Sequence, residues 1–205
     1  MTRVGVITTF PLMRTFAMSP VESSISSIQF RFAIQSDSID IVELVESAYR
    51  GDTSRAGWTT EADLLDGQRT DIGEISSIID DPNARLLLAT TEQGIVGCIL
   101  IRREPEGAYV GMVAVAPSLQ ARGIGRRLLG EAEIRSATEF GARRWRMTVI
   151  EQRTELIAWY VRHGYIVTGR REPFPYGDSR FGIPRREDLR FMVLEKSLAP
   201  LHQKM

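Results

Sequence analysis

The residues whose types and spacing most clearly suggest chemistry lie in residues 113–126. Val-Ala-Val-Ala-Pro is followed closely by Gln120-Ala121-Arg122-Gly123-Ile124-Gly125-Arg126. This order predicts a strand, a loop with two glycines and a helix that begins at once. Backbone N–H groups and about half a positive charge at a helix N-terminus attract anions. Because glycine has no side chain to block a close approach, the segment predicts a site for a phosphate or pyrophosphate.

Two common nucleotide-binding motifs do not fit this segment. The chain has no G-x-x-x-x-G-K-[ST] loop, which argues against a Walker-type nucleotide site. The pair Gly123 and Gly125 lacks the third glycine and the early strand of a dinucleotide-binding fold. Glycines at the joint between a loop and a helix can also serve turn geometry alone.

Hydrophobic periodicity predicts the elements that position this loop. Hairpin-like strands come first and strand–helix alternation follows, which favours a mixed α/β (α+β) fold with a sheet of six or seven strands covered by helices. Strands are expected over 28–34, 85–91, 95–102, 109–115, 145–150, 165–169 and 191–194. Helices are expected after Asp37, over 125–139 and over 155–162, with shorter ones over 61–65 and 74–79.

Residues 28–197 are predicted to form one domain, between a leader over residues 1–27 and a tail over residues 198–205. The leader is rich in Ser, Thr and Met, with Arg3 and Arg14 among them. Three interpretations of it are open: a presequence, a disordered leader, or a start placed too early, with Met18 as a second possible start. We expect a cytoplasmic protein, and the leader leaves organellar targeting open.

Composition excludes several classes of protein. The chain of 205 residues carries 26 basic and 26 acidic residues, so nucleic-acid binding driven by bulk charge is not expected. One cysteine, Cys98, and two histidines argue against a disulfide and against a metal site. No apolar run approaches the ~18 residues of a membrane span.

The glycine loop resembles the signature Q/R-x-x-G-x-G/A of the GNAT superfamily of acyl-CoA-dependent N-acyltransferases. Gln120, Gly123 and Gly125 match it, and residues 159–165, Trp-Tyr-Val-Arg-His-Gly-Tyr, resemble the family's Y-x-x-x-G-F/Y stretch. The resemblance covers about residues 28–197. It implies a mostly antiparallel sheet of six or seven strands with helices on both faces, splayed between the fourth and fifth strands.

The resemblance also implies roles for single residues. Val113 and Val115 would pair with the pantetheine arm of acetyl-CoA, and the amides of residues 121–126 would hold the pyrophosphate. Tyr160 would protonate the CoA thiolate, which suits a phenol with a pKa near ~10. From the residues alone, Tyr160 is interpreted as a buried aromatic on a helix beside Trp159. The expected cofactor-binding set is Met112, Val113, Ala114, Val115, Gln120, Ala121, Arg122, Gly123, Ile124, Gly125, Arg126, Arg153 and Tyr160.

Two departures from the family pattern affect the proton chemistry. Arg153 stands where many family members have Asn, and it could contact CoA, pair with a nearby glutamate or be solvated. The general base is not evident from the sequence. Tyr109 and Thr148 occupy strand positions where an acid could stand, and Glu151 follows as the candidate base. Acids of the polar stretch 50–71, namely Glu61, Asp63 and Asp71, are alternatives.

The acceptor side is expected to involve the polar stretch 50–71 and residues 174–176. Trp58, Glu61, Phe174 and Tyr176 suit a small molecule with an amine and an apolar body. The expected function is acetyl transfer from acetyl-CoA to a primary amine by direct attack, without a metal. A protein acceptor is possible, and no nucleic-acid or membrane partner is expected. The protein would be a monomer or homodimer. The alternatives are a catalytically inactive CoA sensor and a phosphate-binding structural protein.

Overall fold

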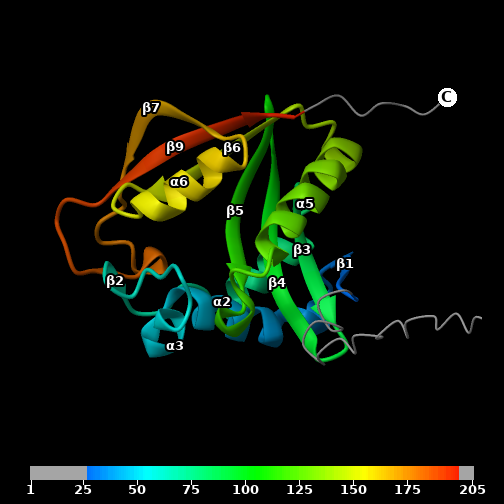
Figure 1. The fold of residues 1–205 in the computed structure, drawn as a ribbon, viewed down its shortest axis with the longest axis horizontal. Helices are drawn as coiled ribbons and strands as arrows, with labels where there is room; N and C mark the ends of the chain where they lie inside the picture. Colours follow the sequence, from blue (N-terminus) through cyan, green and yellow to red (C-terminus); the bar gives the residue numbers. More distant parts are fainter. Residues whose placement is uncertain (1–26, 199–205) are drawn as a thin grey trace, which may run out of the picture.

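A seven-stranded sheet organises the protein. The computed structural model describes residues 27–198, and nearly all of the predicted leader and tail lie outside that range. The strand order is β1-β3-β4-β5-β6-β9-β7, as Figure 1 shows. All neighbours are antiparallel except β5 and β6, which are parallel. The mixed, mostly antiparallel sheet predicted from the sequence is therefore confirmed.

The predicted elements form close to their expected bounds. The strands of the main sheet are β1 Gln29–Phe32, β3 Ala84–Thr91, β4 Gly94–Glu104, β5 Gly107–Val115, β6 Arg144–Ile150, β7 Ile166–Pro173 and β9 Arg190–Ser197. The helices are α2 Ser38–Tyr49, α3 Gly51–Arg55, α4 Ile72–Asp80, α5 Ile124–Phe140 and α6 Thr154–Arg162. Short 3-10 turns occupy Gln35–Asp37, Pro117–Leu119 and Ser179–Phe181. None of the helices in the described residues is long and apolar enough to cross a membrane.

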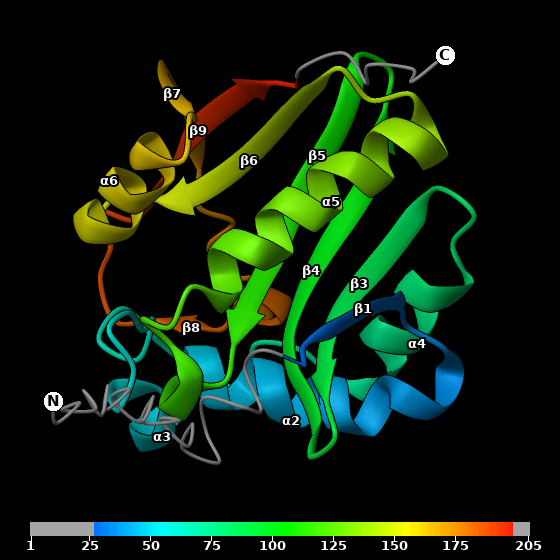
Figure 2. The same ribbon diagram turned by 45° about the vertical axis from the view of Figure 1, so that its right-hand side comes forward.

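Helices cover both faces of the sheet, as predicted (Figure 2). α5 and α6 lie over one face, and a core that includes Leu128, Trp145 and Tyr160 fills the space between. α2 and α4 lie over the other face, above a separate core that includes Ile41 and Ile75. Alternation of inward and outward residues along the central strands supplies both cores at once.

A bulge in β5 redirects its side chains. Ala108 and Val110 point into the α5 face, whereas Met112 and Ala114 belong to the core under α2. The pairing with β4 slips here, between Cys98 and Leu100. Met112 has a φ of 47°, which supplies the local kink.

β5 and β6 separate beyond the bulge. They pair only at Ala108 with Trp145 and at Tyr109 with Arg146. Figures 1 and 2 show the two strands close together at one end and divergent at the other. The splay predicted between the fourth and fifth strands of the sheet is therefore present, and it leaves the edge of β5 from Val113 to Val115 without a neighbouring strand.

The polar stretch 50–71 differs from its prediction. The prediction of a short helix over residues 61–65 is wrong. The Glu61 carbonyl accepts hydrogen bonds from the amides of Leu64 and Leu65, which form a turn, and β2, Leu65–Asp66, then begins. β2 pairs with β8, Ile183–Pro184, in a second small sheet. The partner lies far along the chain, so local periodicity could not indicate this pairing. The stretch also contains α3, which was not expected.

Candidate active site

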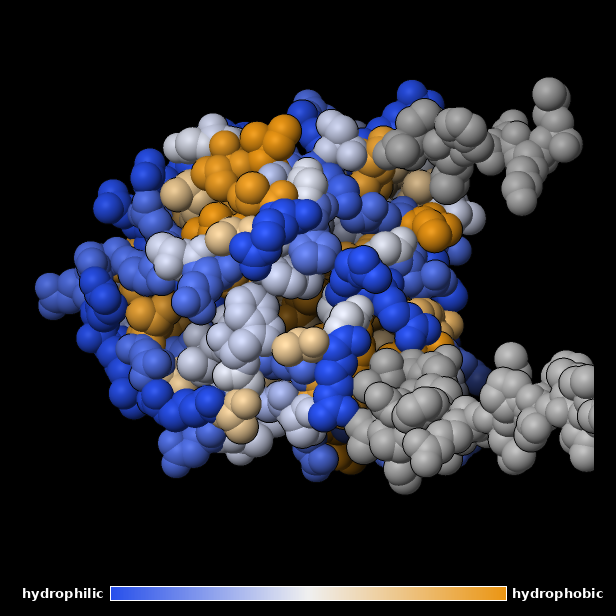
Figure 3. All heavy atoms as spheres, viewed as in Figure 1, coloured by the Kyte–Doolittle hydropathy of each residue, from blue (hydrophilic) through white to orange (hydrophobic). Residues whose placement is uncertain are grey.

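A cavity of about 240 Å³ lies where the sequence predicts the phosphate site. It is bounded by the end of β5, the glycine loop and α6, and Figure 3 shows the surface hollowed between α6 and the start of α5. The glycine-loop residues on its wall are Gln120, Ala121, Gly123, Ile124, Gly125 and Arg126. Trp58, Trp159 and His163 contribute rings from the opposite side. We call this space the donor cavity.

The glycine loop presents the N-terminus of α5 to the donor cavity. Gly123 precedes the helix with a φ of +80°, a conformation that costs other residues ~1–2 kcal/mol. A Cβ built on Gly123 would meet nothing within 4 Å, so the space above this backbone is open. Ala121 also has a positive φ, of 59°. The loop can therefore accept an anion against backbone N–H groups.

Gln120 ties the wall of the donor cavity together. Its Oε1 accepts a hydrogen bond from the Trp58 amide at 3.0 Å, and its Nε2 donates to the Val115 carbonyl at 3.1 Å. A Cβ on Gly57 would lie 2.4 Å from the same Oε1, so this contact depends on a glycine. The side-chain amide thus joins the loop of Trp58 to the end of β5. Gln120 therefore holds the wall of the donor cavity in place.

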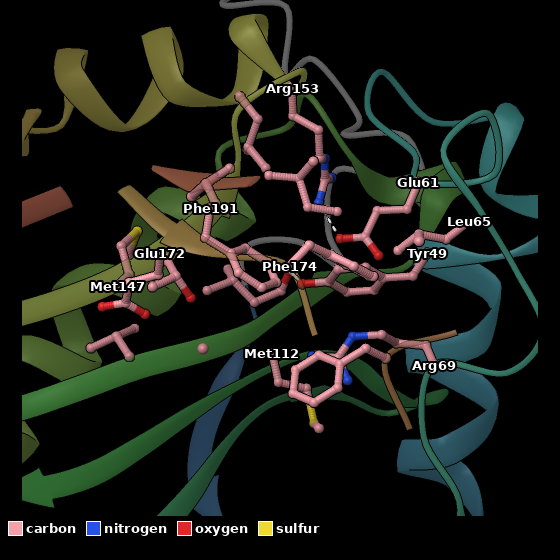
Figure 4. A pocket seen from close by; sticks show the side chains of 18 of the residues that line it. Tyr49, Glu61, Leu65, Arg69, Met112, Met147, Arg153, Glu172, Phe174 and Phe191 are labelled. Carbon is pink, nitrogen blue, oxygen red and sulfur yellow. Dashed lines mark hydrogen bonds and ion pairs between the residues drawn. The ribbon is translucent and has the colours of Figure 1, made fainter. Parts of the chain in front are cut away.

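A second cavity, of about 370 Å³, lies on the other side of β5 and is shown in Figure 4. We call it the acceptor cavity. Leu65, Met147, Phe174 and Phe191 give it apolar walls. Its charged lining consists of Arg50, Glu61, Arg69, Arg146, Arg153 and Glu172. The space therefore suits a molecule with an apolar body and polar ends.

The two cavities meet at four residues that line both: Val113, Arg153, Leu156 and Tyr160. Tyr160 is 5% exposed and packs edge-on against Trp159 and Tyr165. Burial raises the pKa of Tyr160 well above its ordinary value of 10.0, and the neighbouring Tyr49 adds to the increase. The phenol is therefore protonated at neutral pH and able to donate a proton at the junction.

A buried ion cluster holds Arg153 at this junction. Glu61 accepts from Arg153 at 2.7 Å through one carboxylate oxygen and from Arg50 at 2.5 Å through the other. Arg153 also donates to Thr59 Oγ1 at 2.9 Å. Burial raises the pKa of Glu61, but the charges of Arg153 and Arg50 outweigh it and hold the pKa below its ordinary 4.5. Figure 4 shows the Arg153 guanidinium pointing to the Glu61 carboxylate, with a dashed line for their ion pair.

The structure brings part of the predicted site together. Val113, Val115 and most of the glycine loop line the donor cavity, while Glu61 and Phe174 line the acceptor cavity. Arg122 lines neither cavity, and Ala114 lies in the core under α2. Met112 faces the acceptor cavity rather than the donor cavity, because the bulge turns its side chain across the sheet.

Three further candidates lie away from their expected places. Trp58 lines the donor cavity instead of the acceptor cavity and stands 6.3 Å from the Trp159 ring. Tyr176 lines neither, since its hydroxyl bonds within its own loop, to Arg186 O and Leu189 N. Glu151 also lines neither. Its carboxylate pairs with Arg171 at 2.7 Å and lies 3.6 Å from Arg190.

The remaining alternatives for a base also have partners. Asp63 pairs with Arg55 at 2.6 Å, and Asp71 caps α4 by accepting from the Glu74 amide. Tyr109 and Thr148 do line the acceptor cavity, and their hydroxyls lie 3.1 Å apart.

Sequence reasoning missed Tyr49, Arg50, Arg69, Arg146, Glu172 and Phe191 in the acceptor cavity. No local pattern marks these residues, because distant segments bring them together.

The sequence profile of the acetyltransferase (GNAT) family matches residues 41–165. The chain belongs to this family. The matched range holds the glycine loop, both strands of the splay and Tyr160. Comparison with curated protein sequences gives no match.

Several solved structures share the fold of this chain. A putative GNAT acetyltransferase from Desulfovibrio desulfuricans aligns with a TM-score of 0.62 and 18% identity, over 84% of this chain and 100% of that one. The ribosomal-protein-S18-alanine N-acetyltransferase from Escherichia coli aligns with a TM-score of 0.62 and 12% identity, over 87% and 98%. A nourseothricin acetyltransferase aligns with a TM-score of 0.59 and 18% identity, over 84% and 99%. At such identities the likeness shows the fold.

Proposed function

We propose that this protein transfers an acetyl group from acetyl-CoA to the amine of a small molecule. The observation that carries the proposal is the meeting of two cavities at Tyr160, one bounded by an anion-binding loop and the other by apolar and charged side chains. The family membership supports an acetyltransferase activity with acetyl-CoA as donor.

The residues of the donor cavity fit acetyl-CoA. The open backbone at Gly123 offers room for the pyrophosphate at the N-terminus of α5. The carbonyls of Val113 and Val115 accept from Tyr49 Oη and Gln120 Nε2, so the backbone polar groups of these residues face the splay rather than β4. Their N–H groups are not paired with β6 and could donate hydrogen bonds to the amide carbonyl oxygens of a pantetheine arm.

Acetyl-CoA supplies an acyl group activated as a thioester. The amine nitrogen forms a bond to the carbonyl carbon while the carbon–sulfur bond breaks, which gives an amide and CoA thiol. Tyr160 donates its proton to the departing sulfur and regains one from solvent.

Glu172 is the carboxylate best suited to take the amine proton. It lines the acceptor cavity with 48% of its side chain exposed and pairs with Arg146 at 3.1 Å, whereas Glu61 is held by two arginines.

The first test is turnover. Purified protein is mixed with acetyl-CoA and a panel of amines, and free thiol is measured. Tyr160→Phe removes the proton donor but keeps the ring, so we expect kcat to fall by ~10²- to 10⁴-fold while acetyl-CoA still raises the melting temperature. An unchanged kcat would make Tyr160 a packing residue only.

The melting measurement also separates the enzyme from a CoA-binding sensor. Acetyl-CoA would raise the melting temperature of both, but the sensor would release no thiol with any amine. A melting temperature that does not respond to millimolar acetyl-CoA or CoA would exclude both.

A further inference from the structure

Four arginines and two glutamates line the acceptor cavity, which leaves two positive charges in excess. A cavity built to bind only an amine would be expected to have the opposite balance, because the amine is a cation in solution. The excess gathers at one end. Arg50 and Arg153 share the single carboxylate of Glu61, and Arg69 stands beside them.

Arg69 has no carboxylate partner within 4 Å among residues 27–198. Its guanidinium lies over the Tyr49 ring, 5.4 Å from the ring centroid, and Figure 4 shows it reaching into the cavity from the segment between β2 and α4. Burial lowers the pKa of Arg69, but Tyr49, Glu61 and Glu74 more than offset this, so the group stays charged. The other three arginines of the cavity are already paired: Arg50 and Arg153 with Glu61, and Arg146 with Glu104 and Glu172.

The segment that carries Arg69 is fixed by α2. Glu46 accepts hydrogen bonds from the backbone amides of both Arg69 and Thr70, at 2.5 and 2.8 Å. Thr70 Oγ1 in turn donates to Glu74 on α4, at 2.8 Å. The backbone that carries Arg69 is therefore fixed before any ligand arrives, and the Tyr49 ring is the contact that orients its guanidinium. Both lower the entropic cost of binding a ligand.

We propose that the acceptor amine also carries a carboxylate, and that Arg69 binds it. A guanidinium offers two parallel N–H donors that match a carboxylate. The apolar walls of Leu65, Phe174 and Phe191 would hold the body of such a molecule while its amine points to Tyr160. The inference rests on the proposed acetyl transfer and narrows its acceptor to amines of the amino-acid type.

The test compares matched acceptors. Leucine, phenylalanine, methionine and 6-aminohexanoate are each offered beside the corresponding carboxamide, with acetyl-CoA, and kcat/KM is measured by thiol release. We expect at least one carboxylate form to exceed its amide by about 10- to 100-fold, the range of a charge-assisted hydrogen bond. For the three α-amino acids, the carboxamide form has the less basic amine, so more of it is neutral and able to attack. A preference for the carboxylate form against this bias is a stringent result.

Variants then connect the preference to Arg69. Arg69→Met should abolish it by lowering kcat/KM for the carboxylate form alone, and Arg69→Lys, which keeps the charge without the fork, should leave an intermediate preference. Arg144→Met is the matched control, since Arg144 pairs with Glu106 and does not line the cavity. Melting temperatures show whether each variant folds. If Arg69→Met does not fold, Arg69→Lys and the wild-type preference carry the test.

Amines acetylated equally well with and without a carboxylate would overturn the inference and leave the acetyltransferase intact. An equal loss for both forms in Arg69→Met would also overturn it. Absence of thiol release with every amine, despite binding of acetyl-CoA, would instead refute the proposed function and the inference with it.

Discussion

The ion cluster around Glu61 allows a quantitative test of how the polar stretch 50–71 is held against Arg153. Glu61→Gln keeps the shape of the side chain but removes the charge that Arg50 and Arg153 share. All three side chains are at most 9% exposed, so the two guanidiniums would face each other with little water to screen them. Removing one partner of a buried ion pair costs ~3–5 kcal/mol.

A chain of this size loses ~2–4 °C of melting temperature per kcal/mol, so we expect Glu61→Gln to melt about 6–20 °C below the wild type. Asp63→Asn is the matched control. Asp63 stands two residues away and pairs with Arg55, but its side chain is 67% exposed. An exposed pair contributes ~0.2–1 kcal/mol, so this control should shift the melting temperature by at most ~4 °C.

Acid should remove the difference in melting temperature between the wild type and Glu61→Gln. The pKa of Glu61 in the folded protein lies below its ordinary 4.5, so its stabilising effect is fully present above that pH and is lost as pH falls through the folded pKa. The melting temperatures of the wild type and Glu61→Gln should therefore converge below about pH 4.5. If both variants melt within ~2 °C of the wild type at pH 7, the cluster is not desolvated as described, and Glu61 does not hold Arg153.

Three further predictions concern the two cavities and the core. Gly123→Val should weaken the acetyl-CoA-induced rise in melting temperature, whereas Gly141→Val, with a φ of +64° and equally open space at the other end of α5, should cost a similar ~1–2 kcal/mol of stability and keep the rise. Equal responses to acetyl-CoA would contradict the loop assignment. Burial raises the pKa of Cys98 to about 12, so the folded protein should resist alkylation at pH 8 and react once unfolded; rapid labelling of the folded protein would show that the thiol is accessible. Glu172→Gln should lower kcat, and Glu151→Gln should not; the opposite result would return the role of base to Glu151.

The donor side of the site could be predicted from local sequence. Gln120, Gly123 and Gly125 sit within six residues of one another, and their types encode a turn, a close backbone approach and a helix start. The strand before the loop and the helix after it follow from hydrophobic periodicity. Tyr160 was identified through the resemblance of residues 159–165 to the family's Y-x-x-x-G-F/Y stretch.

The acceptor side could not be predicted in the same way. Arg153 and Glu61 are 92 residues apart in the chain, yet they form one ion cluster. Glu151 has the same residue type as Glu61 and lies closer to Tyr160 in sequence, but it pairs with Arg171 away from both cavities. A carboxylate becomes part of a site through its neighbours in space, which its own sequence position does not reveal.

The sequence by itself determined the order of the main strands and helices, the family and the position of the glycine loop, because these depend on residues close to one another along the chain. The tertiary structure decided which charges share the acceptor cavity and left Arg69 there without a carboxylate partner within 4 Å among the described residues. It also turned Met112 to the acceptor side through a bulge of one residue in β5. Such features arise from packing between distant segments, where burial and charge balance, rather than periodicity, set the outcome.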